Sequence, residues 1–125
     1  MHSVTSNAVT RKIATIGTQV LLFNGSAYDG STKQLNESYK NYRFLYIQLQ
    51  TNVDYDFILA PTDNIGNNTK FCRTLMSASS TGQVSSFPYQ STAIITILSE
   101  TSFKCSSIYT NNNWVLKVTA IWGVN

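Results

Sequence analysis

One stretch of strict alternation, YRFLYIQLQ, constrains the fold of this chain more than any other feature. Successive side chains of a β-strand point to opposite faces, so alternation at every second residue marks a strand with one buried face. Here three aliphatic side chains share one face and three polar or aromatic side chains share the other: Leu45, Ile47 and Leu49 against Tyr46, Gln48 and Gln50. Such a strand needs neighbouring strands and a second layer over its apolar face.

Short strands and polar turns also describe the segment between Gly17 and this stretch. A strand is expected at about 18–23, and a short strand leads into Leu35. Turns are expected at 24–26 and at 29–30, where Gly follows Asn or Asp.

The second half of the chain predicts further strands. DYDFILAP, TKFCRTLMSA and the closing segment WVLKVTAIWGV each read as strands, and TAIITILSETSFKCSSIY reads as a hairpin with its turn near 99–102. In the closing strand, simple alternation places five side chains on one face: Trp114, Leu116, Val118, Ala120 and Trp122. About eight strands predict an all-β fold, an antiparallel β-sandwich or jelly roll, over residues 18–125.

Residues 1–17 differ from the rest because their apolar positions follow a helical period. Val9, Ile13 and Ile16 are spaced i, i+4 and i+7, and Gly17 follows at a C-cap position. A helix of about three turns is marginal in water, so its apolar stripe must be buried. It packs either on its own domain or against copies of itself around an axis.

Neutral hydrogen-bonding side chains supply most of the polarity. The chain contains 15 Ser, 15 Thr and 12 Asn, whereas Asp, Glu, Lys and Arg together make up 12%. The single histidine, His2, lies beside the terminus, so no Ser-His-Asp or Cys-His arrangement is available inside the domain. No enzyme activity is expected. Asp54 and Asp56 leave one enzymatic alternative. They would share a strand face with their carboxylates about 6–7 Å apart, which is within the range of a glycosidase pair.

The sequence contains no signal for a cofactor, a metal, nucleic acid or a membrane. Its isolated glycines form no phosphate-binding loop, and its acids do not have EF-hand spacing. The net charge of +3 comes from scattered basic residues. Cys72 and Cys105 lack zinc-ligand spacing and are expected to be buried free thiols, with a disulfide between them as the alternative. No apolar run approaches the ~20 residues of a membrane span, and the N-terminus lacks a secretion-signal core.

Saccharide recognition is the chemistry that this composition suits best. Aromatic rings stack on the apolar C–H patches of sugar rings, and Asn, Gln, Ser and Thr bond to the hydroxyls. Most aromatic side chains of a β-sandwich belong to its core, so each candidate also has a structural interpretation. The candidates for ligand binding are Tyr42, Tyr46, Tyr55, Tyr89, Tyr109 and Trp114.

Three segments carry a family resemblance: MHSVTSNAV, LLFNGSAYDGSTKQLNESYKNYRFLYIQL and FKCSSIYTNNNWVLKVTAIWGVN. The first is similar to the junction that precedes the C-terminal head of bacteriophage and prophage tail-fibre or tail-tip proteins, where a repetitive stalk ends. The other two resemble the early strands and the closing strand of such heads. The segment from Asp54 to Gln90 has no such counterpart.

The resemblance implies a homotrimer with a β-rich head that binds a bacterial surface receptor, frequently a saccharide. It places the protein in a virion tail or a prophage-encoded particle, with the remainder of a tail-fibre stalk as a further partner. It also implies that residues 1–17 are the end of a trimeric stalk, with Val9, Ile13 and Ile16 at the oligomer interface. It assigns no binding residue at any position.

Three hypotheses about function follow. The leading one is a non-enzymatic receptor-binding head of a phage-like tail fibre that recognises a bacterial cell-surface glycan. The alternative is a structural trimerisation or assembly knob of a fibre, with no external ligand. The third is a polysaccharide depolymerase that uses Asp54 and Asp56.

Overall fold

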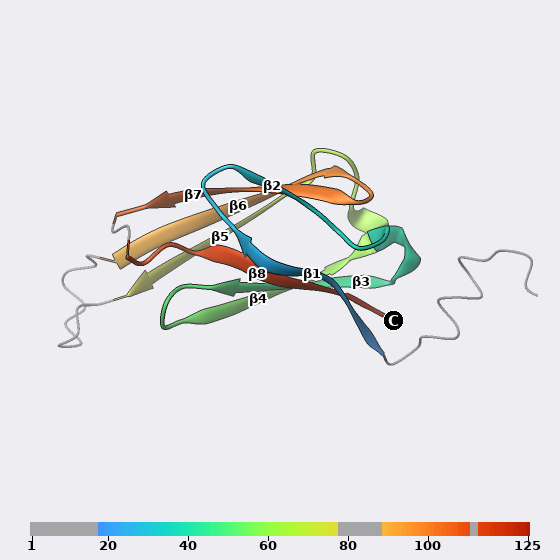
Figure 1. The fold of residues 1–125 in the computed structure, drawn as a ribbon, viewed down its shortest axis with the longest axis horizontal. Helices are drawn as coiled ribbons and strands as arrows, with labels where there is room; N and C mark the ends of the chain where they lie inside the picture. Colours follow the sequence, from blue (N-terminus) through green and yellow to red (C-terminus); the bar gives the residue numbers. More distant parts are fainter. Residues whose placement is uncertain (1–17, 78–88, 111–112) are drawn as a thin grey trace, which may run out of the picture.

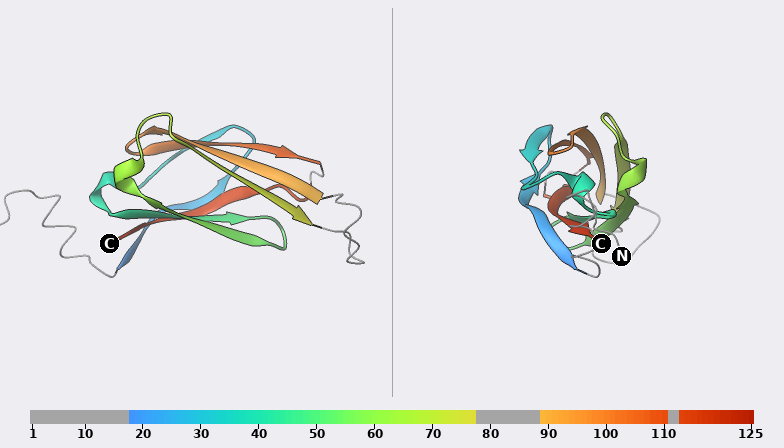
Figure 2. Two further views of the ribbon diagram at one scale, coloured as in Figure 1. Left: turned by 180° about the vertical axis from the view of Figure 1, so that it is seen from behind. Right: turned by 90° about the vertical axis from the view of Figure 1, so that its right-hand side faces the viewer.

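Two four-stranded antiparallel sheets pack face to face in the computed structural model of this chain, which describes residues 18–77, 89–110 and 113–125 (Figure 1). Sheet A has the order β1-β8-β3-β4, with bounds β1 (Gln19–Ala27), β8 (Lys117–Val124), β3 (Phe44–Gln50) and β4 (Tyr55–Pro61). Sheet B has the order β2-β7-β6-β5, with bounds β2 (Ser31–Gln34), β7 (Ser102–Tyr109), β6 (Tyr89–Ser99) and β5 (Lys70–Ser77). Figure 2 shows the two layers from behind and end-on. The predicted all-β antiparallel sandwich is confirmed.

The core lies between the two sheets. Leu45, Ile47 and Leu49 of β3 are almost completely buried, as their alternation predicted. Phe23 of β1 meets Phe103 of β7 edge-to-face, with the ring centroids 5.1 Å apart. Because these two strands belong to different sheets, this pair ties the inner faces together.

The turns predicted near 99–102 and at 29–30 are both confirmed. β6 and β7 form a hairpin in which Ser99 pairs with Ser102. Asp29 and Gly30 both have positive φ, 54° and 85°, a conformation that Gly adopts freely and Asp tolerates. This second turn carries the chain from sheet A to sheet B, since β1 and β2 lie in different layers.

The turn expected at 24–26 is wrong, because these residues continue β1. In the pairing of β1 with β8, Asn24 is opposite Ala120 and Ala27 is opposite Val118. Three steps along β1 therefore match two along β8. The extra residue makes the backbone bulge at 24–26 instead of reversing.

Another bulge interrupts the closing strand. Two successive residues of β3, Gln48 and Leu49, pair with Ala120 and Val118, so Thr119 is an extra residue in β8. An inserted residue of this kind breaks the period of two, because the strand gains one step that its partner lacks.

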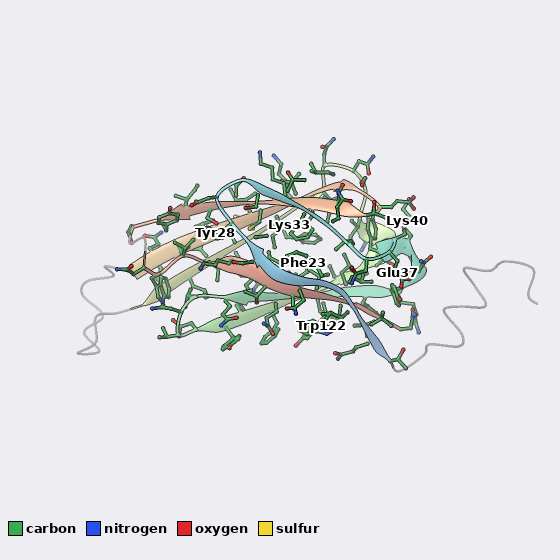
Figure 3. All side chains as sticks on the ribbon, in the orientation of Figure 1. Phe23, Tyr28, Lys33, Glu37, Lys40 and Trp122 are labelled. Atoms are coloured by element: carbon green, nitrogen blue, oxygen red, sulfur yellow. The ribbon has the colours of Figure 1, made fainter. Side chains whose placement is uncertain are left out.

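The bulge exchanges the two faces of β8 beyond it. Val118 and Ile121 are both buried, although they are three residues apart. Trp122 lies on the outer side of sheet A, whereas Phe23 lies between the sheets (Figure 3). The prediction that Trp122 shares a face with Val118 is therefore wrong, because one extra residue moves every later side chain to the opposite face.

The helix predicted for residues 1–17 lies outside the described residues, as do the interface candidates Val9, Ile13 and Ile16. The short helices that are described are the 3-10 turns η1 (Tyr39–Asn41) and η2 (Thr62–Asn64). Within the described ranges, no helix has the length and apolar character that crossing a membrane requires.

The C-terminus and the β3–β4 turn lie at opposite ends of sheet A. β1 begins at Gln19, opposite Val124 of β8, so the start of the sandwich and the C-terminus lie at the same end. The turn between β3 and β4 lies at the opposite end (Figure 1). A segment preceding β1 therefore joins the sandwich far from the β3–β4 turn.

The two cysteines are free thiols in different surroundings. Cys105 lies on the inner face of β7, where burial raises the pKa of its thiol to about 11 and keeps it protonated at neutral pH. Cys72 is exposed on the edge strand β5, so the expectation of two buried thiols is wrong for this residue.

Gly123 of β8 packs directly against the ring of Tyr42. A Cβ atom at Gly123 would lie under 3.0 Å from three atoms of that ring, closer than real side chains approach. Tyr42 is fully buried, so its ring has no free space into which to move. The close approach of strand and ring therefore requires glycine.

Replacing Gly123 with alanine should lower the free energy of unfolding by about 1–3 kcal/mol, the usual cost of overpacking a filled core. Gly66→Ala is the matched control, since a Cβ at Gly66 would meet no atom within 4 Å. Urea unfolding measures both variants. Equal stability of the two would show that Tyr42 is not held against Gly123 in solution.

Candidate functional site

The outer face of sheet A carries a group of partly or fully exposed apolar side chains, called here the aromatic face: Leu21, Tyr46, Tyr55, Phe57, Leu59 and Trp122. Four of them form one row across the four strands, because Trp122 pairs with both Leu21 and Tyr46, and Tyr46 pairs with Leu59. Side chains in such a row lie within contact distance of their cross-strand neighbours. The aromatic face is thus continuous across the sheet.

The rings of the aromatic face pack against one another. Tyr46 stacks on Phe57, with centroids 5.3 Å apart and planes 8° from parallel. Trp122, on the neighbouring strand to the other side, lies 5.8 Å from Tyr46 at 41°. Phe57 and Tyr55 are 41% and 58% exposed. The packed rings therefore form a fixed apolar platform that solvent reaches.

A depression of about 220 Å³ adjoins the aromatic face at the end with the β3–β4 turn, and it is called here the polar depression. The bulge at 24–26 and the bulge at Thr119 contribute to its wall, which is consistent with the role of bulges in redirecting side chains beside binding sites. Its lining consists of Gly25 and Ser26 from β1, Gln50, Thr51 and Asn52 from β3 and its turn, and Lys117 and Thr119 from β8.

Hydrogen bonds connect the polar depression with the aromatic face. Gln50 Nε2 donates to the Tyr55 hydroxyl at 3.2 Å, and Gln48 Nε2 donates to Thr119 Oγ1 at 2.9 Å. These bonds hold two side-chain amides in place beside the rings. The apolar platform and its polar border therefore form one site.

Two of the six predicted ligand-binding residues, Tyr46 and Tyr55, lie in this site. Tyr42 and Trp114 are 0% and 4% exposed, so the expected surface position is wrong for both. Tyr42 fills the space beside Gly123, and Trp114 lies just before β8. Both belong to the interior, the usual place of aromatic side chains in a sandwich.

The other two candidates lie in sheet B. Tyr109 is the last residue of β7, and its hydroxyl donates to Asp29 Oδ2 at 3.1 Å. This hydrogen bond raises the pKa of Tyr109, because it favours the protonated hydroxyl. Tyr89 is the first residue of β6, and its side chain lies outside the described residues.

Most residues of the site were not among the candidates, and three of them are central to its chemistry: Phe57, Trp122 and Lys117. Phe57 follows Tyr55 by two positions in DYDFILAP, and this alternation is a signal that would have placed the two rings together. Trp122 is assigned to the core face by simple alternation, since no residue of the sequence marks the bulge. Lys117 is one of several scattered basic residues and carries no signal of its own.

Of the two carboxylates of the enzymatic alternative, Asp56 lies on the edge strand β4 and Asp54 lies beside its start. Asp56 Oδ2 is 3.5 Å from Arg73 Nε on β5, an ion pair that links the two sheets. Asp56 Oδ1 also accepts the backbone N–H of Phe57 at 2.8 Å, while Asp54 precedes the strand. Among the described residues, no three His, Cys, Asp or Glu side chains are grouped as a metal site would require.

A second depression, of about 320 Å³, lies beside η1 and η2. Its described lining consists of Lys40, Thr62, Asp63 and Ile65, none of which is aromatic. Lys40 Nζ is 3.7 Å from a carboxylate oxygen of Glu100. This depression lacks the ring platform that distinguishes the site on sheet A.

No protein-family model matches this chain, and no curated protein matches it either. The function of this chain is therefore inferred from the chemistry of the site. That chemistry is an exposed platform of packed rings bordered by neutral hydrogen-bonding side chains.

The two tryptophans should differ in their access to a small quencher. Trp122 is partly exposed and Trp114 is buried, so acrylamide should quench the emission of Trp122 strongly and that of Trp114 weakly. The folded Trp114→Phe variant should keep most of the quenchable emission, and Trp122→Phe should lose most of it. Stern–Volmer titrations check this, and equal quenching of the two variants would contradict the outward orientation of Trp122.

Proposed function

We propose that this chain is the non-enzymatic receptor-binding head of a phage-like tail fibre, which recognises a saccharide on the bacterial surface. The observation that carries the proposal is the aromatic face lying beside the polar depression on sheet A. The fibre context comes from the resemblance of MHSVTSNAV and the strand segments to tail-fibre heads.

The chemistry of the site complements a sugar ring. A pyranose offers apolar C–H patches on its faces and hydroxyls around its rim. Tyr46, Phe57 and Trp122 provide a platform of rings already ordered by their mutual packing, while Gln50 and Thr119 provide polar groups at its border. Such preorganisation reduces the entropic cost of binding.

The position of the polar depression also supports a fibre head. A stalk preceding β1 would join the sandwich at Gln19. The polar depression lies near the β3–β4 turn, at the opposite end of sheet A (Figure 1). A receptor site at this end would face away from the stalk and toward a cell.

A single shallow site of this size is expected to bind a glycan weakly. The polar depression, at about 220 Å³, is smaller than the ~300–1,000 Å³ of pockets that enclose drug-sized ligands. Three tethered copies in a homotrimer would strengthen binding by ~10²-fold or more, because the later contacts are intramolecular. Weak glycan contacts would then suffice for adsorption.

Removing one ring from the aromatic face should reduce glycan binding without unfolding the protein. Phe57→Ala should lower retention on host cells or on a glycan array by about tenfold, equivalent to ~1.4 kcal/mol of lost contact. Ile108→Ala is the matched control, because Ile108 is 65% exposed in sheet B, away from the site. Urea unfolding checks that both variants fold. Absence of retention on every host tested, or equal loss in the two variants, would contradict the proposal.

A structural trimerisation knob is the second candidate function, because the aromatic face would also suit burial between subunits. Leu59 is 59% exposed on this face. Exposed apolar patches commonly mark protein–protein contacts. In a knob, the trimer would cover the aromatic face and leave no external site there.

The two candidates differ in the expected effect of Leu59→Ser on solution mass. We expect light scattering to give the full chain a mass of three times 13.9 kDa, and Leu59→Ser to leave this mass unchanged. Dissociation of the trimer by Leu59→Ser would favour the knob, since the face would then be the interface. A monomeric unsubstituted chain would remove the support for a fibre head.

A further inference from the structure

Among the described residues that line the polar depression, one side chain is charged, and it is a cation. Lys117 lines it together with residues that are all neutral, so none of the lining residues in the described ranges is acidic. Lys117 Nζ lies 4.8 Å from the centroid of the Tyr28 ring. This contact stabilises the ammonium through the ring face and leaves its donors available to other partners.

A hydrogen-bond donor lies beside this cation on the same strand. Thr119 Oγ1 accepts from Gln48 Nε2, and this bond does not use the hydroxyl proton of Thr119, which can be donated to an acceptor. Asn52, in the exposed β3–β4 turn, adds an amide to the lining. A negative group in the depression would therefore meet both positive charge and neutral donors.

We infer that the polar depression binds an acidic sugar residue, with Lys117 contacting its negative group while the adjoining sugar stacks on the aromatic face. This inference rests on the proposed function and deepens it, because it specifies the chemical class of glycan. A neutral sugar would gain hydrogen bonds here but no Coulomb attraction from the ammonium. An ammonium group acts as a point charge and does not select the shape of an anion, so both a carboxylate and a phosphate ester suit this place.

The pairing of the strands places Lys117 in the polar depression. It lies in register with Gln50, at the end of β3 where the polar depression meets the Tyr55 hydroxyl. The Thr119 bulge separates Lys117 from Trp122 along β8 and leaves both on the outer side of sheet A. One strand thus contributes the ring for stacking and the cation for charge recognition.

Matched monosaccharides test the inference by amide NMR titration of the full chain at millimolar concentrations. The probes are glucose, glucuronate, glucose 6-phosphate and inorganic phosphate. We expect glucuronate, glucose 6-phosphate or both to shift the amides of Gln50, Lys117 and Thr119, and to bind at least about threefold more tightly than glucose. Whichever acidic sugar binds more tightly identifies the source of the negative group.

Charge removal provides the second arm of the test. Lys117→Gln should weaken binding of the acidic sugar by about three- to tenfold and change glucose binding much less, because glucose makes no charge contact with the ammonium. Lys104→Gln is the matched control, because Lys104 is an exposed lysine on β7 of sheet B. Higher salt should weaken binding of the acidic sugar to the unsubstituted chain, and Lys117→Gln should reduce this dependence.

The outcomes separate this inference from the proposed function. Equal binding of glucose and glucuronate, or unchanged affinity in Lys117→Gln, would overturn the inference while leaving a neutral glycan site. Inorganic phosphate that reproduces the shifts at the same concentration would also overturn it, because a simple anion site needs no sugar. Failure of all monosaccharides, together with absent cell or glycan retention, would overturn both.

Discussion

The register of β8 between β1 and β3 is the constraint on which the rest of sheet A depends. Both edges of this strand are paired, so the face of each residue is decided by two neighbours. The extra residue at Thr119 allows Val118 and Ile121 both to enter the core. The same insertion sends Trp122 outward, where it meets Tyr46. One local irregularity therefore completes the interior and the exposed surface together.

The inner and outer faces of the sheet consequently support different tasks. Inside, the edge-to-face contact of Phe23 with Phe103 and the fit of Tyr42 against Gly123 fix the spacing and position of the strands. Outside, the strands present apolar rings, whose exposure to water is unfavourable in free energy unless a partner covers them. A rigid sandwich that displays ordered rings beside neutral polar groups is a physical basis for weak, multivalent sugar recognition, as proposed.

Local patterns predicted a good part of this arrangement. Alternation placed Tyr46 on the polar, aromatic face of β3, and the structure confirms it. The same rule failed for Trp122, because a bulge leaves no mark on a sequence in which apolar residues stand on both sides of it. Tyr42 and Trp114 were expected at the surface only because they are aromatic, and residue type does not distinguish an exposed ring from a buried one.

The sequence by itself determined that the chain forms an antiparallel sandwich, because period-two alternation and turn residues act over a few neighbouring positions. It also determined that most polar side chains are uncharged, since Ser, Thr and Asn far outnumber charged residues. Only the tertiary structure decided which rings meet and where Lys117 lies. Those outcomes depend on pairing between strands up to about a hundred residues apart, such as Leu21 with Trp122. They also depend on bulges, whose cost in free energy is offset only when the two sheets pack.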